Sequence, residues 1–276
     1  MSKRCIVAGV FAASLLTGGA AAALDSGAAI VELESPIARA QPLQGLLRRP
    51  SGAGPFPAIV LLHSCNGNWQ KLDERWGRQI APWGYVTLTV DSFGPRGIDE
   101  TCGNGTPADM AFDAYRALDF LVRQHAVDPD RVAVLGFSQG GWLALSSVEQ
   151  GVVEHNSPNK FRAAVAFYPN CRTIQGNLTV PALIMIGELD DWTSAEGCRR
   201  LAEGSDDYGV ARRREGAPVK LIVYPGAYHG FDSLALKTPK ELFGHRLQYN
   251  QAAAEQSAVA LRAFLDAVIG GRESGN

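Results

Sequence analysis

The sequence predicts an α/β domain in which a mostly parallel central sheet is covered by helices on both faces. Three observations support this fold class. Continuous apolar runs, typical of strands buried on both faces, recur along the chain. Stretches with helical periodicity separate these runs, and such alternation is typical of parallel sheets. A chain of 276 residues with 46% hydrophobic residues also has enough apolar side chains for one large core.

The expected strands and helices can be placed by residue range. Short strands at residues 29–33 and 43–47 are expected to form an antiparallel edge of the sheet. Buried strands are expected at residues 58–62, 85–90, 132–135, 163–167, 182–186 and 221–224. Helices are expected over residues 70–80, 107–123, 142–149, 194–202 and 251–268. Thr106 and Pro107 have the residue types favoured at a helix N-cap and first helical position.

The first residues of the chain have the pattern of a secretory signal peptide. Lys3 and Arg4 precede an apolar run over residues 5–16, and small residues follow. An apolar run of about 12 residues is shorter than the roughly 20 that a membrane span requires, which favours a cleaved signal over an anchor. We therefore expect residues 1–23 to be removed, residues 24–276 to form a single domain, and the mature protein to be periplasmic or secreted.

The charge of the chain argues against a nucleic-acid partner. The chain has 26 basic and 28 acidic residues, and no stretch forms a basic stripe. No second segment is apolar for long enough to cross a membrane. The polar stretch over residues 203–217, which contains three consecutive arginines, is expected to be a solvated loop or a frayed helix. We expect no membrane association after signal cleavage, and the composition leaves the oligomeric state open.

A serine between two glycines occupies the most informative junction of the chain. The segment GFSQG, residues 136–140, ends the predicted strand at residues 132–135 and opens the following helix. In a glycine-rich chain this pattern alone is weak evidence. Between a strand and a helix, however, it is typical of a nucleophile elbow, which holds the serine hydroxyl above the carboxyl ends of the strands. We therefore predict that Ser138 is a nucleophile.

A serine nucleophile requires a base, and the base requires a carboxylate that orients it. After an elbow the expected chain order is serine, acid, histidine, each on a loop that follows a strand. His229 directly follows the last predicted strand and is the expected base. Asp190 and Asp191 follow the strand at residues 182–186, and Glu188 is a weaker third candidate. The remaining histidines are better explained as residues of a local turn, the surface or the framework: His63, His125, His155 and His245.

Two backbone N–H groups are also required, because negative charge develops on the substrate oxygen during acyl transfer. Each such donor contributes roughly 3–4 kcal/mol of transition-state stabilisation. One is expected from Gln139, the residue after the nucleophile. The other is expected from the loop that follows the strand at residues 58–62, which reads HSCNG over residues 63–67.

Four cysteines remain once the signal segment is set aside: Cys65, Cys102, Cys171 and Cys198. An even number in an exported chain favours disulfides, and four cysteines allow three pairings. We favour Cys65–Cys102 and Cys171–Cys198, because each pair would join loops after neighbouring predicted strands; four free buried thiols are the alternative. No two cysteines have the Cys-x-x-Cys spacing, which argues against a zinc site or a redox pair.

Together these motifs resemble the dienelactone hydrolase family within the α/β-hydrolase fold. The resemblance covers most of residues 40–270 and rests on five segments in order: VLLHSCNG, GYVTLTVDSFGPRG, VLGFSQGGW, LIMIGELDDWT and YPGAYHGFD. It implies that Asp190, rather than Asp191, is the acid and that His229 is the base. It also implies that the amides of Cys65 and Gln139 hold the oxyanion.

Two differences from the namesake enzymes of that family concern the substrate. Those enzymes use a cysteine nucleophile where this chain has Ser138, and they hold a substrate carboxylate with arginines. No arginine follows His229 closely, so Arg96 is the candidate for an anionic group, with pairing to Asp91 or Asp99 as the alternative. We expect a serine hydrolase of carboxylic esters or lactones that needs no cofactor. The alternatives are an acyltransferase, a small peptidase, or a non-catalytic binding protein on the same fold.

Overall fold

The structure is a computed structural model, and the part that it describes comprises residues 28–34, 42–103, 105–106, 108–205 and 216–270. The expected signal peptide at residues 1–23 lies outside these ranges. The same holds for Pro107 and for the three consecutive arginines of the polar stretch.

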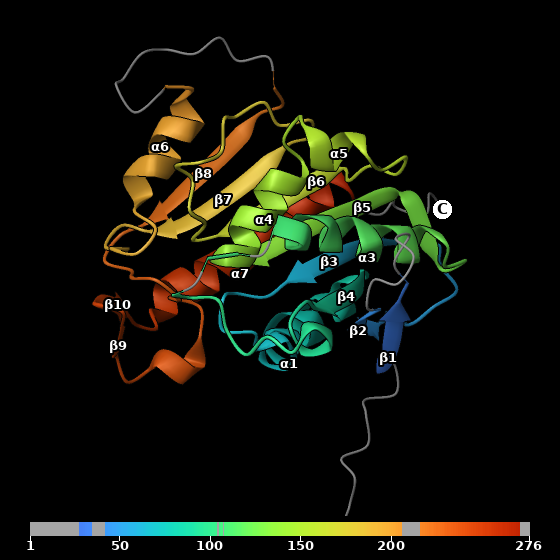
Figure 1. Ribbon diagram of the computed structural model, residues 1–276, viewed down its shortest axis with the longest axis horizontal. Helices are drawn as coiled ribbons and strands as arrows, with labels where there is room; N and C mark the ends of the chain where they lie inside the picture. The colour runs from blue at the N-terminus through green and yellow to red at the C-terminus, as the bar shows by residue number, and fades with distance from the viewer. Residues whose placement is uncertain (1–27, 35–41, 104, 107, 206–215, 271–276) are drawn as a thin grey trace, which may run out of the picture.

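The described chain forms an eight-stranded sheet that is mostly parallel (Figure 1). In order across the sheet, the strands are β1 (Ala28–Leu33), β2 (Leu43–Arg48), β4 (Val86–Asp91), β3 (Phe56–Leu62), β5 (Val127–Phe137), β6 (Ala163–Phe167), β7 (Ala182–Gly187) and β8 (Val219–Tyr224). β2 pairs antiparallel with both β1 and β4, and the neighbours from β4 to β8 pair in parallel. The predicted fold class and antiparallel edge are confirmed.

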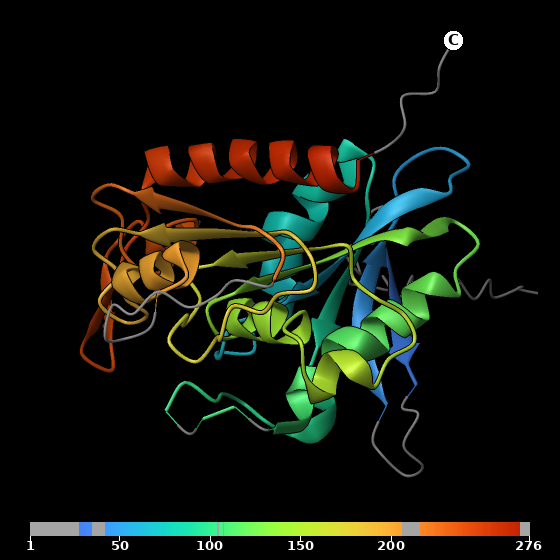
Figure 2. The ribbon, with the colours of Figure 1, turned by 90° about the horizontal axis from the view of Figure 1, so that it is seen from above.

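Helices cover both faces of this sheet. The α-helices are α1 (Trp69–Leu72), α2 (Arg78–Ile80), α3 (Asp113–Val122), α4 (Gln139–Ser147), α5 (Val152–His155), α6 (Ala195–Glu203) and α7 (Gln251–Val268). A π-helical segment, Asp73–Gly77, joins α1 to α2. Figure 2 shows α3 and α4 on one face and α7 on the other. None of the helices in the described ranges has the length and apolar character of a membrane span.

The centre of the sheet is a rigid platform because its strands are apolar on both faces. Val60 of β3, Leu135 of β5, Val165 of β6 and Ile184 of β7 have no exposed surface. Each buried aliphatic side chain of this kind stabilises the fold by roughly 1.5–3 kcal/mol. The loops that leave the carboxyl ends of these strands are therefore anchored at their bases.

Two α-helices begin three or more residues away from their predicted starts, whereas α1 and α6 begin within one residue of theirs. The helix expected over residues 107–123 opens with a 3-10 segment, Ala108–Phe112, and becomes α-helical only at Asp113, a common arrangement at helix starts. α4 begins at Gln139, directly after Ser138, and not at Trp142. The two glycines in its first turn have low helix propensity, so the sequence pattern placed the start of the helix after them.

Two short features were not predicted at all. A hairpin of β9 (Lys240–Leu242) and β10 (His245–Leu247) forms a separate two-stranded sheet. Its strands have three residues each, too few for a period-2 pattern to be read. The second is the single-turn helix α5, which ends at His155.

Candidate active site

Ser138 lies at the turn between β5 and α4 with φ 54° and ψ −115°, a backbone conformation that residues other than glycine rarely adopt. The flanking glycines are required by close packing. A Cβ at Gly136 would lie 1.9 Å from the carbonyl oxygen of Gly140. A Cβ at Gly140 would lie 2.3 Å from the carbonyl oxygen of Leu62, at the end of β3. The turn therefore brings α4 against the central strand and presents the serine side chain at the carboxyl edge of the sheet.

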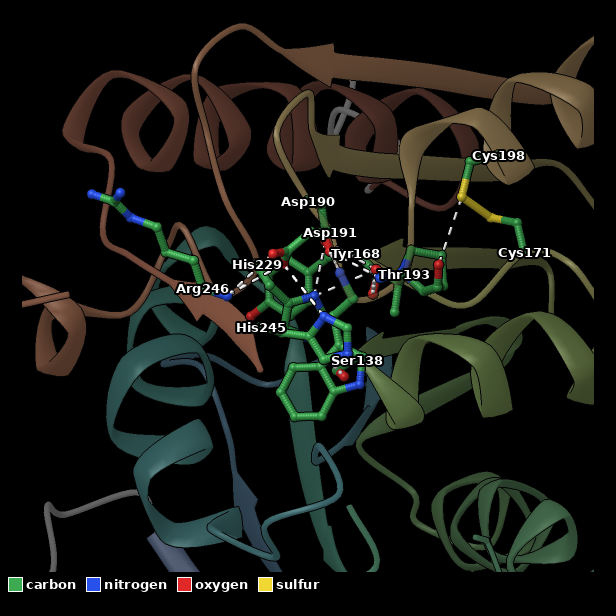
Figure 3. A network of polar contacts seen from close by, with 12 residues as sticks. Ser138, Tyr168, Cys171, Asp190, Asp191, Thr193, Cys198, His229, His245 and Arg246 are labelled. Carbon is green, nitrogen blue, oxygen red and sulfur yellow. Dashed lines mark hydrogen bonds and ion pairs between the residues drawn. A yellow bond between two sulfur atoms is a disulfide. The ribbon is translucent and has the colours of Figure 1, made fainter. Parts of the chain in front are cut away.

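The side chains of Ser138, His229 and Asp190 form a continuous hydrogen-bonded chain (Figure 3). His229 Nε2 lies 3.0 Å from Ser138 Oγ, and His229 Nδ1 lies 2.8 Å from Asp190 Oδ2. All three residues are buried and follow the ends of β5, β7 and β8. With the proton on Nδ1 donated to the carboxylate, Nε2 is free to accept the serine hydroxyl proton.

Asp190 is held by the turn that follows it. Its Oδ1 accepts the backbone N–H groups of Trp192 at 3.0 Å and Thr193 at 2.9 Å, and its Oδ2 accepts the Thr193 hydroxyl at 2.9 Å. Burial acts to raise the pKa of Asp190, but His229 and the Thr193 donors outweigh it, so the pKa lies below its usual value. Asp190 therefore stays ionised beside His229.

Asp191, the other acid that the sequence left open, faces away from His229. It is exposed, and it accepts the backbone N–H of Arg246 at 3.3 Å. Its carboxylate lies 3.7 Å from His245 Nδ1. Figure 3 shows Asp191 turned toward His245 and Arg246, while Asp190 is turned toward His229.

The two predicted oxyanion donors lie on the wall of one pocket. Gln139 is the first residue of α4, where helix geometry leaves the N–H without an intrahelical acceptor. Cys65 follows β3 and lines the same pocket as Ser138. The pocket has a volume of about 340 Å³, and its lining residues are Cys65, Thr101, Cys102, Gly103, Gly105, Thr106, Ser138, Gln139, Trp142, Asn170, Thr173, Trp192 and Thr193.

Both favoured disulfides are present. Cys65 bonds to Cys102, with their Cα atoms 4.8 Å apart, and Cys171 bonds to Cys198, with their Cα atoms 5.0 Å apart. The first bridge joins the loops after the neighbouring strands β3 and β4 and lies in the pocket wall. The second joins the loop after β6 to α6, so that one partner lies in a helix and not in a loop (Figure 3).

Arg96 forms a two-pronged ion pair with Asp113 of α3. Its two terminal nitrogens lie 2.7 and 2.8 Å from the two carboxylate oxygens, and one of them also donates to the backbone oxygen of Ser92 at 2.7 Å. Asp113 was not among the partners considered from the sequence, because it lies on a different element. Arg96 is absent from the described lining of the pocket, and its action on a substrate remains a prediction.

His63 forms hydrogen bonds within the local turn, which is the role that the sequence analysis favoured for it. Its Nδ1 lies 2.8 Å from the backbone oxygen of Ser64, and its Nε2 accepts the backbone N–H of Ser92 at 3.2 Å. Burial lowers the pKa of His63, and this effect outweighs the opposing influence of Ser64 and of nearby carboxylates. A neutral imidazole thus connects the loops after β3 and β4.

Sequence reasoning missed a buried polar cluster beneath His229. Tyr168, at φ 38°, packs its ring 4.6 Å from the His229 ring and donates its hydroxyl to Asp232 Oδ1 at 2.7 Å. Asp232 Oδ2 accepts the Trp76 indole N–H at 2.7 Å and lies 3.2 Å from Arg75 Nε. Burial and the Asp232 charge raise the pKa of Tyr168, so the phenol stays protonated. The available signal was an aspartate close after the candidate base, in YHGFD.

Three known proteins illustrate what the chain is similar to. Acylamino-acid-releasing enzyme 1 of Oryza sativa is 30% identical over 149 residues, which cover 51% of this chain and only 17% of that protein. The "Probable 2-oxo-3-(5-oxofuran-2-ylidene)propanoate lactonase" of Bradyrhizobium sp. is 24% identical over 67% of this chain and 77% of its own length. Thermophilic esterase Est2 of Thermogutta terrifontis has the same fold, with a TM-score of 0.63, 22% identity, and coverage of 91% of this chain and 96% of its own.

The family comparison extends over nearly the whole described chain. The match to the dienelactone hydrolase family runs from residue 43 in β2 to residue 269 after α7. It therefore includes the parallel sheet, the elbow and all three loops that supply the hydrogen-bonded side chains. The chain belongs to the dienelactone hydrolase family.

Proposed function

We propose that this protein is a serine hydrolase that cleaves carboxylic esters or lactones through an acyl-enzyme intermediate. The observation that carries the proposal is the chain of contacts from Ser138 Oγ to His229 Nε2 at 3.0 Å and from His229 Nδ1 to Asp190 Oδ2 at 2.8 Å. These hydrogen-bonded side chains supply a base that can remove the serine proton, without which the hydroxyl is a poor nucleophile.

In the first half of the reaction, Ser138 Oγ attacks the ester carbonyl carbon while His229 Nε2 takes its proton. The carbonyl oxygen becomes an oxyanion, which the amides of Cys65 and Gln139 hold. Collapse of this intermediate breaks the ester bond, and the leaving alkoxide takes the proton from His229. Asp190 keeps the imidazole in the required tautomer and stabilises the imidazolium.

In the second half, water replaces the alcohol. His229 removes a proton from the water as its oxygen attacks the acyl carbon, and Ser138 leaves with the proton that His229 then returns. Hydrolysis of a lactone follows the same steps, with the leaving oxygen still attached to the acyl group. The named activities of the lactonase and the esterase described above support this bond type.

A peptidase acting through the same residues is the second candidate. It is favoured by the similarity to acylamino-acid-releasing enzyme 1. The serine attacks an amide carbonyl as it attacks an ester carbonyl, but the amine that leaves is a poorer leaving group than an alcohol and must be protonated. The two candidates can therefore be separated by comparing an anilide with an ester of the same acyl group. Measurable hydrolysis of N-acetyl-alanine p-nitroanilide that Ser138→Ala abolishes would favour the peptidase, and hydrolysis of the corresponding p-nitrophenyl ester alone would favour the esterase.

Ser138→Ala tests the proposal directly. We expect the purified wild-type protein to hydrolyse p-nitrophenyl acetate or butyrate and the variant to lose this activity while keeping its circular dichroism spectrum. Ser146→Ala, on the same helix but outside the described pocket lining, is the matched control and should retain activity. A fluorophosphonate probe should label the wild type and not Ser138→Ala. Full activity in Ser138→Ala would exclude the proposal, and no labelling with no turnover would favour a binding protein.

We also propose that the protein is exported. The signal pattern of residues 1–23 and the two disulfides, which persist in oxidising compartments, support this location. Fractionation of expressing bacterial cells should recover the protein in the periplasm or medium with a mass that lacks about the first 23 residues. Recovery of the full-length chain in the cytoplasm would contradict it.

A further inference from the structure

The described lining of the pocket contains aromatic, hydroxyl and amide side chains, but no Arg, Lys, Asp or Glu. Arg96, the residue that the sequence suggested for binding an anionic group, forms hydrogen bonds to Asp113 and is absent from that lining. A carboxylate on the substrate would therefore find no cationic side chain among the described lining residues. Among the described residues, this lining favours an uncharged substrate.

Two indoles form the apolar part of this lining. Trp142 lies in the first turns of α4 and donates its indole N–H to the Thr173 hydroxyl at 2.9 Å. Trp192 follows Asp190, and its ring lies 5.2 Å from that of His229 and 5.2 Å from that of His245, nearly parallel to the latter at 16°. Trp192 is thus held in a fixed orientation beside the base, where His245 is also seen in Figure 3.

The tip of the β9–β10 hairpin places a third aromatic ring beside two residues that line the pocket. Figure 1 shows this hairpin at the end of the sheet toward which β7 and β8 point. Phe243 lies at its turn, with its ring centroid 6.2 Å from that of Trp192 in an edge-on arrangement. A Cβ at Gly103 would lie 3.5 Å from the Phe243 ring. Phe243 therefore lies next to Trp192 and Gly103, two lining residues from different loops.

A phenylalanine is unfavourable for folding stability at position 243, because of its backbone conformation and its exposure. Phe243 and Gly244 have φ angles of 52° and 81°, the left-handed pair of a two-residue hairpin turn that normally contains asparagine or glycine. The side chain is also 60% exposed to water. Because most of its surface stays in contact with water in the described structure, Phe243 stabilises the fold less than a buried phenylalanine would. A ring that binds beside Trp192 would cover this exposed surface.

We propose that Phe243 and Trp192 form an aromatic subsite that binds an uncharged planar ring of the substrate ester. The inference rests on the proposed function and narrows it to neutral aromatic esters. Aromatic rings in edge-on or offset contact attract one another beyond the effect of area alone, and loss of one such contact weakens binding by roughly three- to tenfold.

The kinetic test compares esters that differ in one ring. Benzyl acetate and methyl phenylacetate carry the ring on the alcohol and acid sides, ethyl acetate has none, and 4-(acetoxymethyl)benzoate carries a ring with a charge. For wild type, kcat/KM should be highest for a neutral ring ester. In Phe243→Ala and Phe243→Leu, the ratio of ring ester to ethyl acetate should fall roughly three- to tenfold. Val259→Ala, a 71% exposed apolar residue on α7, is the control and should leave the ratio unchanged.

An unchanged ratio for both neutral ring esters, or a preference for the charged ester, would overturn the subsite. A second experiment measures ligand binding and does not depend on ester hydrolysis. Calorimetry should detect N-benzylacetamide binding to Ser138→Ala, roughly three- to tenfold more weakly once Phe243→Ala is added. If wild type hydrolyses neither these esters nor p-nitrophenyl butyrate and a fluorophosphonate probe does not label it, the proposed function fails. The calorimetry still decides the subsite in that case: equal affinity, or no binding, refutes it.

Discussion

At the scale of single residues, the environment of Asp190 separates it from its neighbour Asp191. Both follow β7 in the same loop, but Asp190 is buried and receives hydrogen bonds from Trp192, Thr193 and His229, whereas Asp191 is exposed. Burial acts to raise the pKa of Asp190, but His229 and the Thr193 donors favour the charged form and lower the pKa below its usual value. In the proposed mechanism, a carboxylate that stays ionised would stabilise the imidazolium form of His229.

Asp190→Asn should lower kcat by about 10³- to 10⁴-fold, because an amide does not hold the imidazole in the tautomer that accepts the serine proton. Asp191→Asn is the matched control from the same loop, and its rate should remain close to that of wild type. Both rates are measured with p-nitrophenyl acetate. Equal losses in the two variants would mean that the assignment of the acid is wrong.

At the scale of elements, His63 connects two loops that follow adjacent parallel strands. Its ring accepts the backbone N–H of Ser92, after β4, and contacts the backbone oxygen of Ser64, after β3. Cys65, the expected oxyanion donor, is the next residue on the β3 loop. Protonation of Nε2 would remove the acceptor for the Ser92 N–H, so the position of this loop depends on a neutral imidazole.

The free energy of unfolding should fall as the pH falls below about 6.5, partly because of His63. Burial lowers the pKa of the folded state, so between the unfolded and folded pKa values only the unfolded chain binds the proton. The stabilisation is complete above the unfolded value and is lost toward the folded one. Urea denaturation at pH 7.5 and 5.5 should show a smaller decrease in His63→Gln than in wild type. An equal decrease would exclude His63 as a contributor.

At the scale of the whole molecule, the two disulfides secure the carboxyl edge of the sheet, and only one of them borders the pocket. Cys65–Cys102 lies in the pocket wall, and the backbone oxygen of Cys65 also accepts the Thr101 N–H at 2.8 Å. Cys171–Cys198 joins α6 to the loop after β6, and neither of its residues belongs to the described pocket lining. The two bridges should therefore differ in their effect on catalysis.

Replacement of both cysteines of either pair by serine should destabilise the protein by a similar amount, about 3–4 kcal/mol, because the closed loops have similar lengths of 37 and 27 residues. At a temperature where both variants remain folded, kcat/KM should fall clearly only in the variant without Cys65–Cys102. Chemical denaturation and ester hydrolysis measure the two quantities. Equal activities of the two variants would argue against a role for the first bridge in shaping the pocket.

The sequence predicted the parts of the molecule that depend on local pattern. The buried strands have continuous apolar runs, and the elbow, acid and histidine segments follow those runs in a fixed order, so the sheet and the contacts of Ser138, His229 and Asp190 could be anticipated. The pairing of Arg96 with Asp113 and the cluster around Asp232 depend on which helix packs over which loop. The aspartate after His229 is the one local signal of that cluster, and it does not identify the partners of the carboxylate. The three-residue strands of the hairpin are too short to give a strand pattern.

In the proposed reaction, the order of the strands along the chain also sets when activity could arise during synthesis. Ser138 and Asp190 follow β5 and β7, but His229 follows β8, the edge strand that pairs with β7 and is the last of the main sheet to leave the ribosome. In the proposed reaction, a chain that ends before β8 would have Ser138 and Asp190 but would lack His229, the proposed base. Ester cleavage by the proposed mechanism would therefore begin only once β8 has joined the sheet, and a chain truncated before β8 should show no ester hydrolysis.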